Sequence, residues 1–518
     1  MEKRENAAEQ PSGSRIKYLS PLGAWALSFG CAVGWGSFIM PGTTFLPLAG
    51  PLGTALGMGV GVVIMLIIGM NYHFLMDRYP SAGGILTYAT KAFGYDHGFL
   101  SSWFLFLVYV AIMWANASAL ILVFRNLLGD VFQFGFHYQI LGYDVYMGEV
   151  LLTMAATVLV CGICIRGKRL AVGLQILLAL VLLVGIVVAF IAVMRTHREQ
   201  GASLSPAFAP SGVSPVLQVL QIVVLSPWAF VGFESVSHSV VGFRFSTKKT
   251  IWVFVAALLT SGAAYILLTL MAGALQPAGY DSWPAYVRDL GALSGVEAMP
   301  TFFATESAFG TAGSVILLIT LLGGVLTGLI GNLIAASRLI CAMAADDILP
   351  KWFGKLNRQG SPRNAILFLM ALSLVIPFFG RTAIGWIVDM TTIGAVIAYG
   401  YTSAAALRIA RQEKRTGRIV TGAVGLAVSV AFFLYFMVST GSMATESYFI
   451  LILWSILGFI FFRFVFRKDR QRRFGKSTVV WIGLLFLIFF TSLMWMRQAT
   501  NRQTEAMISN ITAYYGEQ

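Results

Sequence analysis

The sequence predicts an all-α polytopic membrane protein with about thirteen transmembrane helices. Two observations lead to this prediction. Charged residues make up 11% of the 518 residues, less than half of the roughly 25% typical of soluble domains. Apolar runs of about 18 residues or more, each long enough to cross a bilayer, recur from end to end. A β-barrel is disfavoured because its short strands would alternate apolar and polar residues.

Thirteen apolar segments are the predicted spans. In chain order they cover residues 21–46, 50–76, 98–124, 147–165, 170–194, 214–241, 251–275, 311–343, 364–380, 384–407, 419–440, 447–466 and 478–496. The connection at 276–310 contains "PAGYDSWPAYVRDL" and is predicted to hold a short amphipathic helix. No segment between the spans is long enough to form a soluble domain.

The basic residues set the predicted topology. A net charge of +14 could indicate nucleic acid binding, but 29 of the 36 Lys and Arg residues lie on one set of alternate connections. That asymmetry follows the positive-inside rule, so nucleic acid is not an expected partner. It places the N-terminus in the cytoplasm and the C-terminus outside, which requires an odd number of crossings. Residues 1–20 lack a cleavable signal pattern and are predicted to be a cytoplasmic tail.

Two apolar spans contain unusual clusters of helix breakers. Residues 31–42 read "CAVGWGSFIMPG", and residues 226–239 read "SPWAFVGFESVSHS". Glycine and proline weaken a helix interior, and freed peptide groups in a membrane are tolerated only where protein or a wet cavity satisfies them. The breaks fall in spans one and six, which hold matching places in two five-helix halves of opposite topology. This pattern predicts a transporter built as a 5+5 inverted repeat, with broken helices 1 and 6.

The predicted domain organisation follows from the repeat. Residues 21–407 form a ten-helix transport core, with repeats at about 21–194 and 214–407. Additional helices 11–13 occupy 408–496, and residues 497–518 form an extracytoplasmic tail. At the breaks, free N–H groups suit a carboxylate and free carbonyls suit an ammonium group or another cation. A zwitterionic amino acid fits both.

Several motifs resemble the amino acid–polyamine–organocation transporter superfamily, in particular its bacterial amino acid permeases. They are "GWGSFIMPG" (34–42), "PSAGGILTYATKAFG...GFLSSW" (80–103), "PWAFVGFES" (227–235), "AASRLICAMAADDILPKWFGKLNRQGSPRNA" (335–365) and "DMTTIGAVIAYGYTSAAALR" (389–408). Their order along the chain also matches the family. The resemblance implies a LeuT-like fold with a central substrate site between helices one, three, six, eight and ten.

The resemblance also implies the candidate substrate-binding residues. Gly34, Trp35, Gly36 and Ser37 would present backbone to a carboxylate, and Phe230, Val231, Gly232 and Phe233 would flank the second break. Trp228 would be a gating aromatic or a packing residue, and Asn116 a substrate contact or a packing residue. Glu234 is the coupling candidate, with a structural carboxylate bonded to backbone donors as the alternative. No Lys lies in residues 170–194, where some proton-coupled relatives have one.

The leading functional prediction is a secondary active transporter that moves amino acids or related amines across the plasma membrane by alternating access. It would be proton-coupled or an exchanger, with protons and membrane lipid as further partners. The alternative is a transporter-like sensor that signals through its extra C-terminal helix. No nucleotide-binding, protease or hydrolase motif occurs, so an enzyme, a cofactor and catalytic residues are not expected. The four cysteines lie in apolar segments, so we expect reduced thiols and no metal site.

Overall fold

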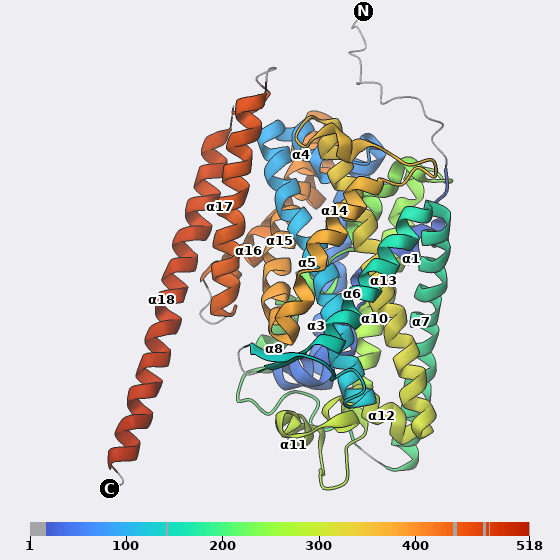
Figure 1. Ribbon diagram of the computed structural model, residues 1–518, viewed down its shortest axis with the longest axis vertical. Helices are drawn as coiled ribbons and strands as arrows, with labels where there is room; N and C mark the ends of the chain where they lie inside the picture. Colours follow the sequence, from blue (N-terminus) through green and yellow to red (C-terminus); the bar gives the residue numbers. More distant parts are fainter. Residues whose placement is uncertain are drawn as a thin grey trace, which may run out of the picture.

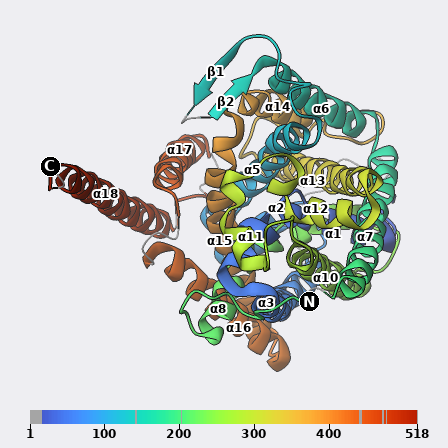
Figure 2. The same cartoon turned by 90° about the horizontal axis from the view of Figure 1, so that it is seen from below.

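A computed structural model describes residues 17–140, 143–201, 203–438, 443–469, 473–475 and 477–516. These residues form a bundle of long helices, with α5 and α13 inside it and a short antiparallel hairpin at one end (Figures 1 and 2). Most of the predicted N-terminal tail, residues 1–16, lies outside the described residues.

The first half of the chain contains both the first break and the hairpin. Its elements are α1 (Pro21–Ala32), α2 (Gly36–Met40), the π-helical turn η1 (Pro41–Phe45), α3 (Leu46–Arg78), α4 (Ile85–Phe93), α5 (Tyr95–Leu128), β1 (His137–Ile140), β2 (Tyr143–Tyr146), α6 (Met147–Arg166) and α7 (Lys168–Glu199). The two strands pair with His137 opposite Tyr146. Ser20 begins α1 by accepting the amide of Gly23, with Pro21 in the first helical position.

The second half begins with the second broken segment. Its elements are α8 (Pro215–Val224), α9 (Ser226–Ala229), the 3₁₀ helices η2 (Phe233–Gly242) and η3 (Thr247–Lys249), α10 (Thr250–Ala274), α11 (Trp283–Arg288), η4 (Leu290–Ala292), η5 (Gly295–Ala298), α12 (Pro300–Phe309), α13 (Thr311–Ala345), η6 (Lys351–Gly354), α14 (Arg363–Ser373), η7 (Ile376–Thr382), α15 (Ala383–Gln412), α16 (Thr416–Val438), α17 (Thr445–Lys468) and α18 (Thr478–Gly516). Helix α11 confirms the short helix predicted between residues 276 and 310.

Each of the thirteen predicted spans contains helix. Within the described residues, eleven helices are long and apolar enough to cross a membrane, or twelve when the bent pair Pro215–Val224 and Ser226–Gly242 counts as one span. The first predicted span makes up the difference from thirteen. Its initial helix α1 has 12 residues, and the rest continues into α3 across a non-helical Gly50. The break itself therefore removes this span from a count based on helix length.

The two broken segments lie side by side and run in opposite directions. At the start of the first, the amides of Tyr18 and Leu19 donate to the carbonyl of Gly242 at the end of the second, at 2.9 and 3.0 Å. Further along, the Ser28 hydroxyl donates to the Phe233 carbonyl at 2.8 Å. The opposite directions agree with an inverted relationship between the segments.

Helices α17 and α18 lie beside the bundle, and α18 extends away from it (Figures 1 and 2). Asp96 at the start of α5 accepts the amides of Gly475 and Ser477 at 2.7 and 2.6 Å, which fixes the connection between the two helices. Asp389 on α15 accepts the Ala444 amide and the Ser447 hydroxyl, and so caps the start of α17.

Helix α18 does not end where its apolar run ends. The prediction separated a span at 478–496 from a tail at 497–518, whereas the structure continues one helix to Gly516. The polar part, "RQATNRQTEAMISN", contains neither glycine nor proline, so the backbone meets no residue that stops a helix. The change in hydropathy at residue 496 marks the end of the apolar run only.

Candidate functional site

The first broken segment leaves helical geometry at Val33, where φ is −110° and ψ is 94°, and resumes it at Gly36. The Ser37 hydroxyl donates to the Gly34 carbonyl at 2.7 Å, and the Trp35 amide donates to Asn116 Oδ1 at 3.4 Å. In this fully described stretch, the amides of Gly34 and Gly36 do not donate to any backbone carbonyl. Two peptide donors are therefore left available at the break.

The second broken segment turns at Gly232, whose φ of 102° lies in the left-handed region. A Cβ atom there would lie 2.7 Å from Cys31 Cβ and 3.0 Å from its backbone. Glycine is thus required for its backbone conformation and for close approach to α1. The Gly232 amide donates to Glu234 Oε2 at 2.9 Å, so a carboxylate two residues later satisfies the peptide group freed by the turn.

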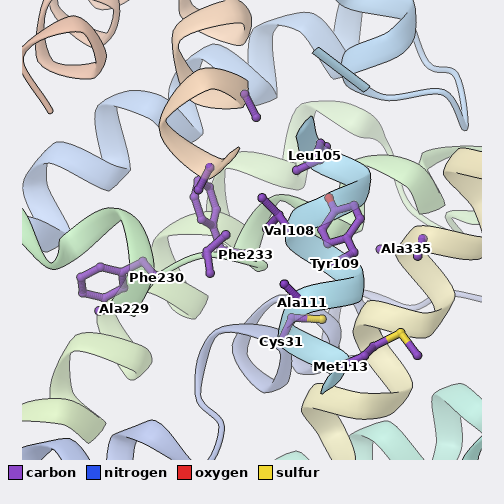
Figure 3. Close-up of a cluster of buried hydrophobic side chains, with 14 of the residues drawn as sticks. Cys31, Leu105, Val108, Tyr109, Ala111, Met113, Ala229, Phe230, Phe233 and Ala335 are labelled. Atoms are coloured by element: carbon purple, nitrogen blue, oxygen red, sulfur yellow. The ribbon is translucent and has the colours of Figure 1, made fainter. Parts of the chain in front are cut away.

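Contacts join the two breaks directly. The Ser235 hydroxyl, just after the second break, lies 3.4 Å from Cys31 Sγ. Tyr265 of α10 also holds the first segment, since its hydroxyl donates to the Ala32 carbonyl at 3.3 Å. Figure 3 shows buried apolar side chains around them, among them Cys31, Ala111 of α5, Phe230 and Phe233. The breaks therefore meet inside the bundle rather than at its surface.

A cavity lies between the breaks. Its wall from the first segment consists of Cys31, Ala32, Gly34, Trp35 and Gly36. The opposite walls come from α5, the second segment, α10 and α15, and consist of Ile112, Ala115, Asn116, Trp228, Val231, Tyr265, Ile387, Val388 and Thr391. The cavity volume is about 30 Å³, room for roughly two or three water molecules. An organic ligand therefore needs these side chains to move apart.

The indole of Trp228 closes one side of the cavity. A Cβ atom on Gly36 would lie 2.5 Å from Trp228 Cη2, so this ring packs directly on the first break. Asn116 packs as closely on Gly34, since a Cβ atom on Gly34 would lie 2.6 Å from Asn116 Oδ1. Two side chains from distant parts of the sequence thus rest on glycine backbone.

The structure divides the predicted site residues into two groups. Six of them line the cavity: Gly34, Trp35, Gly36, Asn116, Trp228 and Val231. The other five surround it without lining it: Ser37, Phe230, Gly232, Phe233 and Glu234. Phe230 packs against Tyr265 at a ring-centroid distance of 6.1 Å, and Phe233 packs against Tyr399 at 5.9 Å. Side chains on one short turn point to opposite sides, so flanking the break does not imply facing the ligand.

Sequence analysis did not single out the cavity residues contributed by α10 and α15. Tyr265 had no signal, because it lies in an apolar run without breakers. Thr391 and Val388 lie within or directly before the stretch "DMTTIGAV", whose resemblance to the family's tenth helix could have indicated them. Ile112 follows from Asn116, since residues four positions apart share a helix face, whereas Ala115 is adjacent to Asn116 and does not follow from that rule.

Glu234 is fully buried behind the second break. Its Oε2 atom also accepts the Tyr399 hydroxyl at 3.3 Å, while Oε1 has no hydrogen-bond partner among the described residues. Tyr72 packs edge-on against both Phe233 and Tyr399. The Glu234 carboxyl group thus lies near buried aromatic rings from α3 and α15, and its Oε1 atom is available to accept a hydrogen bond or a proton.

His238, four residues beyond Glu234, is fully buried. Its Nδ1 atom lies 3.0 Å from the Ala82 carbonyl, and its ring packs edge-on against Tyr109. Because a carbonyl only accepts, Nδ1 carries the proton in this contact. His238 therefore links the second segment to the connection before α4.

Gln175 of α7 braces the first segment from a third side. Its Nε2 atom donates to the carbonyls of Ala26 on α1 and Thr327 on α13, both at 3.2 Å. Gln175 lies in the span where the expected family lysine is absent. A neutral amide therefore connects α1 to α13 at this position.

The described part of the chain contains no cluster of three or more His, Cys, Asp or Glu side chains suited to a metal ion. All four cysteines are free thiols. The chemistry available at the cavity is therefore that of peptide groups, hydroxyl and amide side chains and aromatic rings.

Comparison with known proteins agrees with this architecture. A model of the amino acid permease family matches residues 19–446, from the start of α1 into α17. The chain belongs to this family. The match covers both broken segments and every residue that lines the cavity, which confirms the resemblance to amino acid–polyamine–organocation transporters. As a member of a transport family, the protein is a multi-pass membrane permease and not an enzyme.

Three relatives show the range of this similarity. The branched-chain amino acid permease BcaP of Lactococcus lactis is 23% identical over 75% of this chain and 81% of its own length. The arginine/ornithine antiporter ArcD1 of the same organism is 25% identical over 71% and 70%. The methylthioribose transporter of Bacillus subtilis is 23% identical over 89% and 96%. Transport proteins named for different substrates are thus similar to this chain to a comparable degree.

Proposed function

We propose that this protein is a secondary active transporter that moves amino acids across the plasma membrane by alternating access at the cavity between α1–α2 and α9–η2. The observation that carries the proposal is the pair of broken helices that meet at one cavity. The unbonded amides of Gly34 and Gly36 face a substrate carboxylate, and the Val231 carbonyl accepts no backbone hydrogen bond and faces an ammonium group.

The packing supports movement of the two broken segments as a unit. They contact each other at Ser28, Cys31 and Gly232, so the two segments can move together. Trp228 rests on Gly36 and closes the cavity, so its displacement admits a ligand. Rocking of these segments against the other helices would expose the cavity alternately to each side of the membrane.

Coupling to protons or to counter-substrate is the finer part of the proposal. Glu234 has one oxygen without a partner in the described structure, and a carboxyl group there can take up or release a proton. Its other oxygen holds the Gly232 amide, so a change in its charge acts directly on the second break. Relatives whose names describe arginine/ornithine antiporters support exchange as an alternative to net uptake.

Membrane location and orientation complete the proposal. The N-terminus is placed in the cytoplasm of a bacterial cell and the C-terminus outside, on the strength of the basic residues in alternate connections. The beginning of α1 and the end of α18 lie at opposite ends of the molecule, which supports an odd number of crossings (Figure 1). A sensor that signals through α18 receives no support from the comparisons.

Transport by purified protein in liposomes tests the proposal. We expect saturable accumulation of labelled amino acids that increases with unlabelled amino acid inside or with an inward proton gradient, and that a sodium gradient does not change. Tight binding without flux under every gradient would contradict transport and favour a sensor.

Glu234→Gln tests the coupling step separately, because it keeps the side-chain shape and removes the titratable group. We expect flux to persist while its dependence on pH disappears. Glu199→Gln is the matched control, since Glu199 is exposed and paired only with Arg195. An unchanged pH profile in Glu234→Gln would exclude this carboxyl group from coupling and leave exchange as the mechanism.

A further inference from the structure

The cavity contains no ionisable acid or base that could pair with a charged substrate side chain. Its fourteen lining residues include no Asp, Glu, Lys, Arg or His. Two acidic residues lie close to the lining in sequence, and both are bonded elsewhere. Asp389, next to Val388, accepts the Ala444 amide and the Ser447 hydroxyl. Glu234 lies behind the second break, where it accepts the Gly232 amide and the Tyr399 hydroxyl. A guanidinium or ammonium group in the cavity would therefore lose its water without gaining a partner.

The polar side chains of the lining are already hydrogen-bonded within the protein. Asn116 donates to the Ile112 carbonyl at 2.9 Å and accepts the Trp35 amide. Thr391 donates to the Ile387 carbonyl at 2.7 Å, and Tyr265 donates to the Ala32 carbonyl. These groups stabilise the walls, so few of their hydrogen-bonding atoms remain for a substrate side chain.

The remaining surface is aliphatic and aromatic. Ile112, Val231, Ile387 and Val388 present branched carbon side chains, and the indoles of Trp35 and Trp228 enclose them. The unbonded peptide groups lie only at the two breaks, where they suit the carboxylate and ammonium groups that every amino acid shares. The cavity thus combines peptide groups that suit the main chain of an amino acid with a lining that is mostly apolar.

We infer that the substrate is a neutral amino acid with an aliphatic side chain, such as valine, leucine or isoleucine. Burying an unpaired charge is strongly unfavourable, and burying an amide or hydroxyl without a hydrogen-bond partner is also unfavourable. Both costs exclude cationic, acidic and strongly polar side chains from this cavity. Because Trp228 must move off Gly36 to admit any ligand, an indole-sized side chain would require a larger displacement and is disfavoured. This inference rests on the proposed transport function.

Competition for uptake into liposomes tests it with defined probes. We expect leucine, isoleucine and valine to compete at least tenfold more strongly than arginine, ornithine, glutamate or tryptophan. Transport of arginine in preference to leucine would overturn the inference while leaving the transport function intact. Absence of flux for every amino acid would instead contradict the proposed function.

A variant in the apolar wall gives a second measurement. Ile112→Ala removes branched carbons that face the cavity, so the preference should shift toward larger apolar side chains such as phenylalanine by about tenfold relative to valine. Ile191→Ala, on a lipid-exposed face of α7, is the matched control and should leave the preference unchanged. If Ile112→Ala keeps the wild-type preference, Ile112 does not contact the substrate side chain and the inference is overturned. The competition series on the unaltered protein does not depend on whether this variant folds.

Discussion

In the first broken segment the amides of Gly34 and Gly36 remain unbonded beside the cavity, whereas in the second the Gly232 amide is bound by Glu234. The first segment is braced from outside, by Asn116 on α5 and Gln175 on α7. The second is braced from within, by a carboxylate two residues beyond its turn. The contrast supports the proposal that the first break offers two amides to a substrate carboxylate, whereas the second offers its Val231 carbonyl and is otherwise held by Glu234.

The largest expected effect comes from filling the space at the first break. Gly36→Leu places a side chain where even a Cβ atom would lie 2.5 Å from Trp228, so the indole is displaced and the cavity is blocked. We expect amino acid uptake to fall by about a hundredfold. Size-exclusion chromatography and thermal melting would establish that the variant folds. Gly59→Ala is the control, because a Cβ atom there meets nothing within 4 Å. Normal uptake in Gly36→Leu would remove the first break from the binding site.

A change at the second break should act on stability. Gly232→Ala combines a left-handed backbone with overlap against Cys31, and we expect it to lower the free energy of unfolding by about 2 kcal/mol or more. Gly279→Ala separates the two causes, since its φ is 100° but no atom lies within 4 Å of the added Cβ. Equal losses in both variants, measured by thermal melting, would show that close packing of the breaks contributes nothing.

The external brace of the first segment can be removed at Asn116. Asn116→Leu has similar volume but leaves the Trp35 amide without its acceptor, at a cost of about 1–3 kcal/mol. Since this amide lies at the break, we expect the apparent affinity for substrate to weaken roughly tenfold, with a smaller change in melting temperature. An unchanged affinity in equilibrium binding would place Asn116 among packing residues only.

The smallest effect is expected from loss of the hydrogen bond between Tyr399 and Glu234, behind the second break. Tyr399→Phe removes the 3.3 Å hydrogen bond to Glu234 and leaves the bond from Gly232 in place. A loss of about 1 kcal/mol in stability and an altered pH dependence of transport should follow. Tyr401→Phe loses a comparable hydrogen bond, which joins Tyr401 to His97 rather than to Glu234. This variant should leave the pH dependence unchanged. Identical pH profiles would separate Tyr399 from coupling.

Local chemistry made both breaks predictable. Gly34, Gly36 and Gly232 permit backbone that other residues resist, and their interruption of apolar runs is visible in the sequence alone. The thirteen apolar segments and the asymmetry of basic residues are likewise visible in the sequence alone. Hydropathy did not indicate how far α18 continues as a helix, because apolar character and helical geometry are different properties and only the first changes at residue 496.

Side-chain direction at the site depended on contacts between distant segments. Phe230 and Phe233 flank the second break just as Val231 does, yet only Val231 faces the cavity. Tyr265 joins the wall from α10, which carries neither a cluster of helix breakers nor a family motif, and Ile387 and Val388 join it from just before the motif at 389–408. The sequence by itself determined where the helices break and that their peptide groups need a partner, because backbone freedom is a property of single residues. Only the tertiary structure decided which side chains enclose that partner, because the helices' relative rotation and crossing arise from packing along their whole length.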